Sequence, residues 1–266
     1  MESNPVSQPW AIAVFDIDGV VRDVSRSYRR ALADTVDHFT DGGYRPTPAD
    51  IDRLKGEGQW NNDWKASEEL IYRYYEAQGR DRNTLALDYE TIVAFFQVRY
   101  RGQQPDVPAA WDGYICDEPL LMSADYLQAL SADGVAWGFF SGATPASARF
   151  VLEQRVGINP PVLIAMGDAP DKPNPTGLIT AAQRLASDPQ LPTIYAGDTV
   201  ADMLTVRRAR YEASDRPWYA VGVLPPHLET ASDRDRYAQQ LTEAGADCVV
   251  EDVEALTSDR VKGLLG

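Results

Sequence analysis

Short apolar segments separated by helical patterns recur along most of the chain. The first, Ala11–Phe15, is apolar throughout and is followed directly by acidic and glycine residues, as expected for a strand buried on both faces. Similar segments occur at residues 135–140, 162–166, 193–196, 219–224 and 247–250. Helical patterns lie between them, one opened by Thr144 with Pro145 and another at residues 176–187. This alternation predicts βαβ units, and hence an α/β fold with a parallel sheet covered on both faces.

The pattern changes between Ser25 and Glu118, where helical stretches follow one another without a convincing strand. The expected helices are one from Tyr28 to about Gly42, one opened by Thr47 with Pro48, and two at residues 68–78 and 89–100. Residues 102–117 would form the linker that returns to the sheet. We therefore expect one domain made of residues 1–22 and 119–266, with a helical domain, residues 23–118, inserted after the first strand.

The composition is that of a globular protein with an excess of acidic residues. Of the 266 residues, 44% are hydrophobic and 24% are charged, which is far from a disordered composition. Asp and Glu number 40 against 25 Lys and Arg, and the net charge of -15 would repel a nucleic acid backbone. The same field would repel a small phosphorylated substrate. A phosphate site in this chain therefore needs local positive charge, and a bound divalent cation is the obvious source.

Cysteine usage and hydropathy predict a cytoplasmic protein. Cys116 and Cys248 form neither a CxxC pair nor a dense framework, which suits a reduced compartment. The first apolar run stops at Asp16, too early for a secretory signal, and no stretch approaches the roughly 20 apolar residues of a membrane helix. We expect neither nucleic acid nor membrane among the partners, and a monomer or homodimer.

Two aspartates stand at the end of the first predicted strand. Asp16 and Asp18 follow Ala11–Phe15 directly, and Gly19 permits a turn that lets the two carboxylates diverge around a ligand. Ligands of open parallel sheets bind outside the carboxyl ends of the strands, so this is a natural site. Taken alone, such a segment is more often a solvated acidic turn.

Later strand ends carry polar residues in the same way. Ser141 and Gly142 follow residues 135–140, Lys172 follows residues 162–166 after a short loop, and Asp198 closes residues 193–196. Lys172 is one of four lysines, and flanking prolines stiffen its backbone, although a loop lysine is most often a surface residue.

Asp202 lies four residues after Asp198, about one turn later if a helix begins there. Both carboxylates could then face one point, and hard oxygen ligands of this kind suit Mg²⁺. The alternative is that Asp198 caps the helix and Asp202 is a favourable charge in its first turn.

Together these segments resemble the four signature motifs of the haloacid dehalogenase superfamily. In order they are DIDGV from Asp16, a strand followed by Ser141, Lys172 in a KPNP loop, and GDTVAD up to Asp202. The resemblance covers the sheet-bearing parts of the chain. It implies a Rossmann-like doubly wound parallel sheet core with an inserted α-helical cap domain, near the phosphoglycolate phosphatase and β-phosphoglucomutase-like branch.

The resemblance also implies roles for individual residues. Asp16 resembles the nucleophile that forms an aspartyl phosphate, and Asp18 resembles the acid that protonates the leaving oxygen and later activates water. In the first step Asp16 must be ionised and Asp18 protonated, so the site must hold the two carboxyls in different protonation states. Ser141, next to Gly142, resembles the donor to a phosphoryl oxygen, and Lys172 resembles the cation that balances nucleophile and phosphate.

The implied cofactor is Mg²⁺. Its ligands by resemblance are the Asp16 carboxylate, the Asp18 main-chain oxygen and Asp198. Asp202 is either a second ligand or a partner of Lys172 or of metal-bound water. Charge stabilisation by the metal and by Lys172 would supply much of the acceleration, because phosphoryl transfer leaves little covalent work for the protein.

The implied function is that of a Mg²⁺-dependent phosphohydrolase that cleaves a small phosphorylated metabolite, such as a sugar phosphate or a similar monoester. Asp18 argues against a dehalogenase, which needs neither a metal nor a second aspartate. A phosphomutase uses the same core residues and stays open. A non-catalytic interaction protein of this architecture would be expected to have lost at least one core residue. A phosphonate hydrolase requires a cap lysine, and neither Lys55 nor Lys65 has distinguishing context.

Substrate choice is expected in residues 56–65 of the inserted domain. Trp60, Asn61 and Asn62 carry indole and amide groups that could stack on and hydrogen-bond to a polyol or sugar. The alternative is that Trp60 and Trp64 pack between helices.

Overall fold

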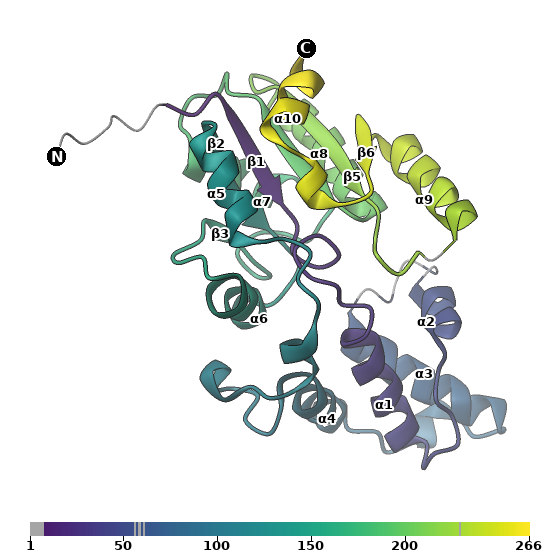
Figure 1. The fold of residues 1–266 in the computed structure, drawn as a ribbon. Helices are drawn as coiled ribbons and strands as arrows, with labels where there is room; N and C mark the ends of the chain where they lie inside the picture. Colours follow the sequence, from purple (N-terminus) through teal and green to yellow (C-terminus); the bar gives the residue numbers. More distant parts are fainter. Residues whose placement is uncertain (1–7, 56, 58–59, 61, 229) are drawn as a thin grey trace. The chain divides into compact units, whose positions relative to one another are not determined.

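The computed structural model describes residues 8–266 apart from 56, 58–59, 61 and 229, and the chain divides into two compact units. The first, here called the core unit, comprises the residues up to Asp23 together with Pro119–Gly266. The second, the helical unit, is Val24–Glu118. Figure 1 labels the elements of both.

The described part of the core unit contains a six-stranded, wholly parallel sheet in the order β3-β2-β1-β4-β5-β6 (Figure 1). The strands are β1 (Ala11–Phe15), β2 (Val135–Phe140), β3 (Leu163–Ile164), β4 (Thr193–Gly197), β5 (Trp218–Val223) and β6 (Cys248–Val250). The first strand in the sequence is central in the sheet, with Phe15 opposite Phe139 of β2 and Ala196 of β4. All five residues of β1 are buried, and the expectation of a parallel α/β sheet is confirmed.

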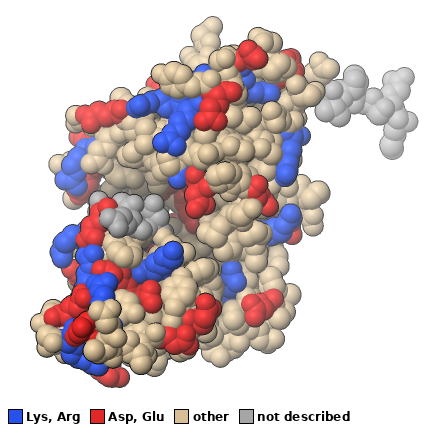
Figure 2. Space-filling model, turned by 180° about the vertical axis from the view of Figure 1, so that it is seen from behind, with Lys and Arg blue, Asp and Glu red and all other residues tan. Residues whose placement is uncertain are grey.

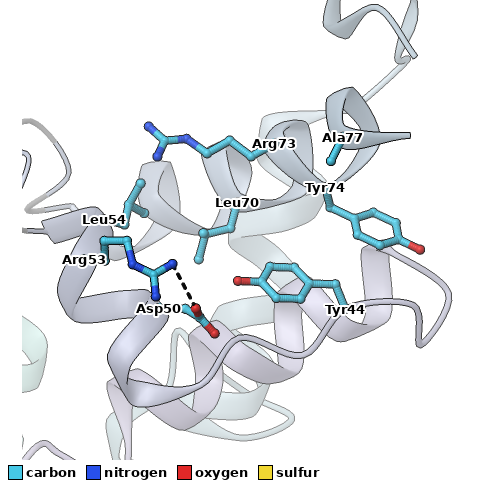
Figure 3. A pocket seen from close by; sticks show the side chains of 8 residues that line it. All are labelled: Tyr44, Asp50, Arg53, Leu54, Leu70, Arg73, Tyr74 and Ala77. Carbon is cyan, nitrogen blue, oxygen red and sulfur yellow. Dashed lines mark ion pairs between the residues drawn. The ribbon is translucent and has the colours of Figure 1, made fainter. Parts of the chain in front are cut away.

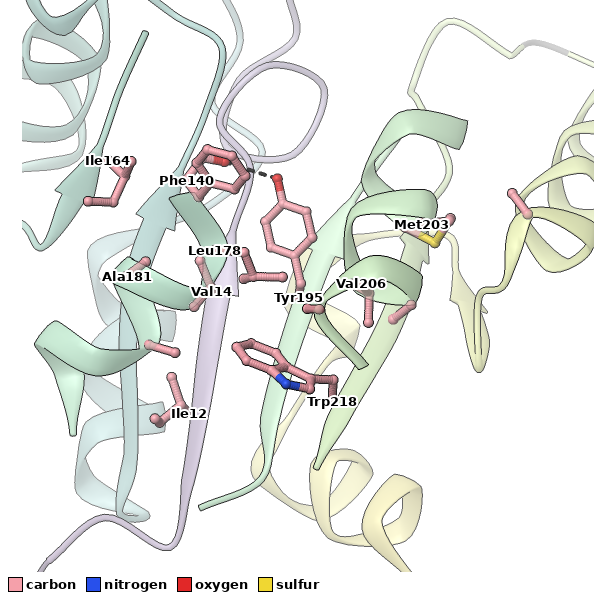
Figure 4. Packing of buried hydrophobic residues seen from close by; sticks show 14 of the residues in the cluster. Ile12, Val14, Phe140, Ile164, Leu178, Ala181, Tyr195, Met203, Val206 and Trp218 are labelled. Carbon is pink, nitrogen blue, oxygen red and sulfur yellow. Dashed lines mark hydrogen bonds between the residues drawn. The ribbon is translucent and has the colours of Figure 1, made fainter. Parts of the chain in front are cut away.

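Helices cover both faces of this sheet (Figure 1). They are α5 (Ala124–Ala132), α6 (Pro145–Arg149) with a π-helical continuation at Phe150–Val156, α7 (Thr176–Leu185), α8 (Val200–Glu212), α9 (Ala231–Ala244) and α10 (Ser258–Leu265). On one face, Val14 of β1 belongs to a buried cluster that includes Leu178 of α7 and Val206 of α8 (Figure 4). On the other face, the ring of Tyr126 of α5 packs edge-on against the ring of Phe15, with ring centroids 6.2 Å apart. The doubly wound arrangement follows from these two apolar layers.

Strand β3 is shorter than the predicted residues 162–166. It lies at the edge of the sheet and pairs only with β2. Beyond Ile164 the backbone leaves the ladder, because the Ala165 N–H donates to Asp168 Oδ2 (2.9 Å) and the Met166 N–H donates to the Ala143 carbonyl (3.0 Å). The strand therefore ends two residues early and gives way to the loop that carries Lys172.

The helical unit consists mainly of α1 (Tyr28–Phe39), α2 (Pro48–Lys55), α3 (Asp63–Ala77) and α4 (Tyr89–Arg101). Helix α3 begins five residues before the predicted start at residue 68. The reason is local: the Asn62 side chain accepts hydrogen bonds from the N–H groups of Trp64 and Lys65 and caps the helix there.

The surface carries charges of both signs. On the face shown in Figure 2, acidic and basic side chains are interspersed over the described residues. Among those residues, no helix combines the length and the apolar character needed to cross a membrane.

Candidate active site

Asp16 follows β1 and is almost fully buried, with 6% of its surface exposed. Its N–H continues the sheet by donating to the Ala196 carbonyl (2.9 Å), and its Oδ1 accepts from the Ile17 N–H (2.7 Å). The chain then turns at Gly19, where φ is +78°. An ideal Cβ on Gly19 would lie 2.1 Å from Asp198 Oδ2. Only glycine therefore lets the loop after β1 approach the end of β4 this closely.

Lys172 is held between two buried carboxylates. Its Nζ lies 2.9 Å from Asp16 Oδ2 and 2.7 Å from Asp202 Oδ1. The rings of Phe140 and Tyr195 flank the ammonium group, each centroid 5.4 Å from Nζ. The lysine predicted from the KPNP loop is thus brought to the end of the central strands rather than left on the surface.

Both carboxylate oxygens of Asp202 have partners in the protein. Oδ1 contacts Lys172 and accepts from the Tyr195 hydroxyl (3.0 Å), while Oδ2 accepts from the N–H (3.0 Å) and Oγ1 (2.6 Å) of Thr199. The N-cap of α8 is Thr199, which forms a capping box with Asp202. The alternative in which Asp198 caps this helix is therefore wrong, because Thr199 takes that position. The contacts favour Asp202 as the partner of Lys172.

Three acidic side chains converge. Asp16, Asp198 and Asp202 each offer a carboxylate oxygen, and these oxygens all lie within 4.8 Å of one another. Burial raises the pKa of Asp16 to about 6; the charges of Asp202 and Asp18 add to this effect, and Lys172 opposes it. Burial, Asp202 and Asp16 likewise hold the pKa of Asp198 well above its usual range.

The two members of the buried ion pair behave differently. Burial would lower the pKa of Lys172, but Asp16 and Asp202 outweigh it and raise that pKa. Burial would raise the pKa of Asp202, but Lys172 outweighs it and lowers that pKa. Lys172 and Asp202 are thus both charged, and one ammonium group faces more carboxylates than it can neutralise.

Ser141 and Gly142 follow β2, the neighbour of β1. Ser141 is buried, and its Oγ accepts from the Ala143 N–H (3.2 Å), which leaves the hydroxyl hydrogen for another acceptor. An ideal Cβ on Gly142 would meet nothing within 4 Å, so there is open space beside this turn.

Sequence reasoning missed Tyr195 and Arg22. The hydroxyl of Tyr195 lies 3.0 Å from both Asp202 Oδ1 and the Phe140 carbonyl, and Figure 4 draws the second contact. Arg22 is fully buried, and its Nε donates to Asp18 Oδ1 at 2.7 Å. Tyr195 looks like any aromatic residue of a buried strand. Arg22, however, directly follows the apolar pair Val20 and Val21. A charged residue in such a position is a sequence signal for a buried and paired charge.

The residues predicted to choose the substrate belong to the helical unit. Trp60 Nε1 donates to Glu57 Oε2 (3.0 Å), and Asn62 caps α3 through its Oδ1. Asn61 lies outside the described residues. The structure thus gives Asn62 and Trp60 local partners, and their part in substrate choice stays a prediction.

The helical unit also contains a cavity of about 330 Å³ (Figure 3). It is lined by Tyr44, Asp50, Arg53, Leu54, Leu70, Arg73, Tyr74 and Ala77. The rings of Tyr44 and Tyr74 are nearly parallel with centroids 6.0 Å apart, and Arg53 Nη1 lies 3.3 Å from Asp50 Oδ1. None of the site residues predicted from the sequence lines this cavity.

The family model of the haloacid dehalogenase-like hydrolases matches residues 10–210. The chain belongs to this family. The predicted family and the prediction of an enzyme are thereby confirmed.

Solved structures share the fold over 79–97% of the chain. A hydrolase from Pseudomonas syringae aligns with a TM-score of 0.62 and 18% identity, covering 96% of this chain and 99% of that one. A phosphatase from Thermococcus thioreducens has a TM-score of 0.64 and 23% identity, covering 79% and 92%. A β-phosphoglucomutase from Clostridium difficile has a TM-score of 0.58 and 15% identity, covering 97% of each chain. At such identities the likeness is one of fold.

Among curated proteins, an imidazoleglycerol-phosphate dehydratase from Phytophthora nicotianae is 29% identical over 230 residues. The match covers 85% of this chain but 46% of that protein. The chain thus spans about half the length of this curated relative.

Proposed function

We propose that this chain is a Mg²⁺-dependent phosphohydrolase that cleaves a small phosphorylated metabolite through an aspartyl phosphate on Asp16. The observation that carries the proposal is the position of Lys172 Nζ, 2.9 Å from Asp16 Oδ2 and 2.7 Å from Asp202 Oδ1. An ammonium group held in this way keeps a buried nucleophile ionised and offers positive charge to an incoming phosphate.

The reaction proceeds in two displacements. In the first, the Asp16 carboxylate attacks phosphorus, the bond from phosphorus to the ester oxygen breaks, and Asp18 gives a proton to that oxygen. In the second, water attacks phosphorus while Asp18 takes a proton from it, the bond from phosphorus to the Asp16 oxygen breaks, and inorganic phosphate leaves the regenerated carboxylate. Ser141 donates its hydroxyl hydrogen to a phosphoryl oxygen, beside the open turn at Gly142.

The charge states of Asp16 and Asp202 fit these two steps. With a pKa of about 6, Asp16 is largely ionised at neutral pH and can act as a nucleophile. Asp202 stays charged through its contacts with Lys172 and Thr199, and it holds the lysine in place.

The acidic cluster also fits a magnesium ion. The Asp16 carboxylate, the Asp18 main-chain oxygen and the Asp198 carboxylate would hold the ion, since Mg²⁺ prefers one or two carboxylates with other hard oxygens. When bound, Mg²⁺ would neutralise charge on the phosphate and on the carboxylates. The raised pKa of Asp198 supports the assignment, because the protein alone supplies too little positive charge to ionise every member of the cluster.

Phosphate release by metal-free protein, with and without added MgCl₂, tests the proposal. We expect Mg²⁺-dependent release from para-nitrophenyl phosphate by the wild type and at least a 1000-fold loss in Asp16→Asn. A matched control is Asp106→Asn, which neutralises an exposed aspartate of the helical unit and should keep wild-type activity. Release that survives Asp16→Asn unchanged would refute the nucleophile.

The helical unit is proposed to act as the cap that selects the substrate, so a panel of phosphate esters should be tested. It should include sugar monophosphates, and also imidazoleglycerol phosphate, because the name of the curated relative contains it. Isomerisation of a sugar phosphate without net phosphate release would favour a phosphomutase. Loss of substrate without phosphate release would favour a dehydratase.

A further inference from the structure

A buried arginine stands beside the proposed acid. Arg22 has no exposed surface, and its Nε and Nη2 each lie 2.7 Å from Asp18 Oδ1. The Asp18 side chain itself is 30% exposed. Burying a guanidinium group is costly unless it is well paired, so a contact at this distance specifies where both groups lie.

The backbone holds the pair together. The N–H groups of Val21 and Arg22 donate to the Ile17 carbonyl (2.8 and 3.2 Å), and the Gly19 N–H donates back to the Arg22 carbonyl (2.9 Å). Arg22 also forms an antiparallel bridge with Leu120, on the segment that leads into α5. Backbone hydrogen bonds to Val21 and Arg22 therefore fix the turn that carries Asp18, and the bridge to Leu120 links this turn to a second part of the core unit.

The contact distinguishes the two oxygens of Asp18. Two of the three guanidinium nitrogens of Arg22, Nε and Nη2, contact Oδ1, whereas the described residues provide no hydrogen-bond partner for Oδ2. Asp18 adjoins Gly19, where an ideal Cβ would lie 2.1 Å from Asp198 Oδ2, so this turn lies against the acidic cluster. In keeping with this, the charge of Asp18 contributes to the raised pKa of both Asp16 and Asp198. Oδ2 is thus the oxygen left for the substrate.

We infer that Arg22 is a positioning residue, which fixes the Asp18 side chain so that Oδ2 meets the ester oxygen of the leaving group. The inference rests on the proposed function, in which Asp18 is the general acid. It predicts a dependence on the leaving group. An alkoxide must be protonated as it departs, whereas para-nitrophenolate departs readily without a proton, so a misplaced acid harms alkyl phosphates far more.

The experiment compares kcat/KM for an alkyl phosphate and for para-nitrophenyl phosphate in Arg22→Met and Arg22→Lys, with Asp18→Asn as reference. This constant reports the steps up to release of the first product, where the acid acts. We expect Arg22→Met to lose at least tenfold more on the alkyl ester than on the aryl ester, in the same direction as Asp18→Asn. Arg22→Lys, which can still donate to Oδ1, should recover part of that difference.

A matched control is Arg216→Met. Arg216 is also a buried arginine of the core unit, but it donates to main-chain carbonyls such as that of Leu191 (2.9 Å) rather than to a site carboxylate. Its loss should lower stability without changing the ratio between the two esters. If Arg22→Met fails to fold, as judged by circular dichroism, Arg22→Lys carries the test through the same ratio.

The outcomes distinguish a failure of the positioning role of Arg22 from a failure of the proposed function. Equal losses on both esters in the Arg22 variants, while Asp18→Asn still discriminates between them, overturn the positioning role and leave the proposed function intact. A wild type without Mg²⁺-dependent phosphate release, or an Asp18→Asn variant without discrimination, overturns the proposed function on which the inference rests.

Discussion

Replacing the proposed nucleophile by its amide should make the metal-free protein more stable. Burial, with the charges of Asp202 and Asp18, raises the pKa of Asp16 from 3.8 to about 6. A carboxyl whose pKa is higher in the folded than in the unfolded protein disfavours folding once the pH exceeds its ordinary pKa. At about 1.4 kcal/mol for each pH unit, the difference amounts to about 3 kcal/mol near pH 7.5. The attraction between Asp16 and Lys172 is already included in this difference, because Lys172 lowers the pKa that burial alone would give.

Urea unfolding, followed by tryptophan fluorescence in EDTA between pH 4 and 8, measures this effect. The difference in the free energy of unfolding between Asp16→Asn and the wild type should be near zero at pH 4. It should rise between about pH 4 and pH 6, from the ordinary pKa of the carboxyl to its pKa in the folded protein, and stay constant above pH 7; Asp106→Asn, at an exposed position, is the control. Mg²⁺ should then favour the wild type, by about 2.7 kcal/mol at 100 times its Kd. An Asp16→Asn protein less stable than the wild type at pH 7.5 in EDTA would refute the reasoning, and so would a difference independent of pH.

Three further substitutions test single contacts. Gly19→Ala places a Cβ 2.1 Å from Asp198 Oδ2 at φ +78°, so kcat/KM should fall at least 100-fold; unchanged turnover would contradict the close approach described here. Tyr195→Phe removes the hydroxyl from Asp202, and thermal unfolding should show a loss of about 1–2 kcal/mol, which a wild-type melting temperature would exclude. Asn62→Ala should cost about 1 kcal/mol in urea unfolding because α3 loses its cap, while turnover of para-nitrophenyl phosphate stays at the wild-type level. Wild-type stability of Asn62→Ala would count against the cap.

The sheet could be predicted from the sequence because its central strands are buried on both faces. The apolar segments at Ala11–Phe15 and Val135–Phe140 have the bounds of β1 and β2. At the edge the prediction was less accurate. Strand β3 has a neighbour on one side only, and Asp168 draws the Ala165 N–H out of the ladder, a side-chain contact that apolar patterning does not encode.

The candidate site was also predictable only in part from the sequence. Asp16, Lys172 and Asp198 could be proposed from the sequence because each stands where a predicted parallel strand ends or shortly after. The part played by Asp202 could not, since capping, metal binding and pairing with a lysine all place a carboxylate at that spacing. The contacts that favour pairing, from Thr199 and Tyr195, join residues whose side-chain directions appear only in the folded chain.

The order of the strands has a consequence for synthesis on the ribosome. β1 is made first, but its neighbours in the sheet are β2, which begins at Val135, and β4, which begins at Thr193. During translation, more than half of the polypeptide must therefore be made before either neighbour of β1, the strand that precedes Asp16, is available to pair with it. A message truncated before the codon for Thr193 would yield a product with one side of β1 uncovered and no Asp202 to hold the lysine.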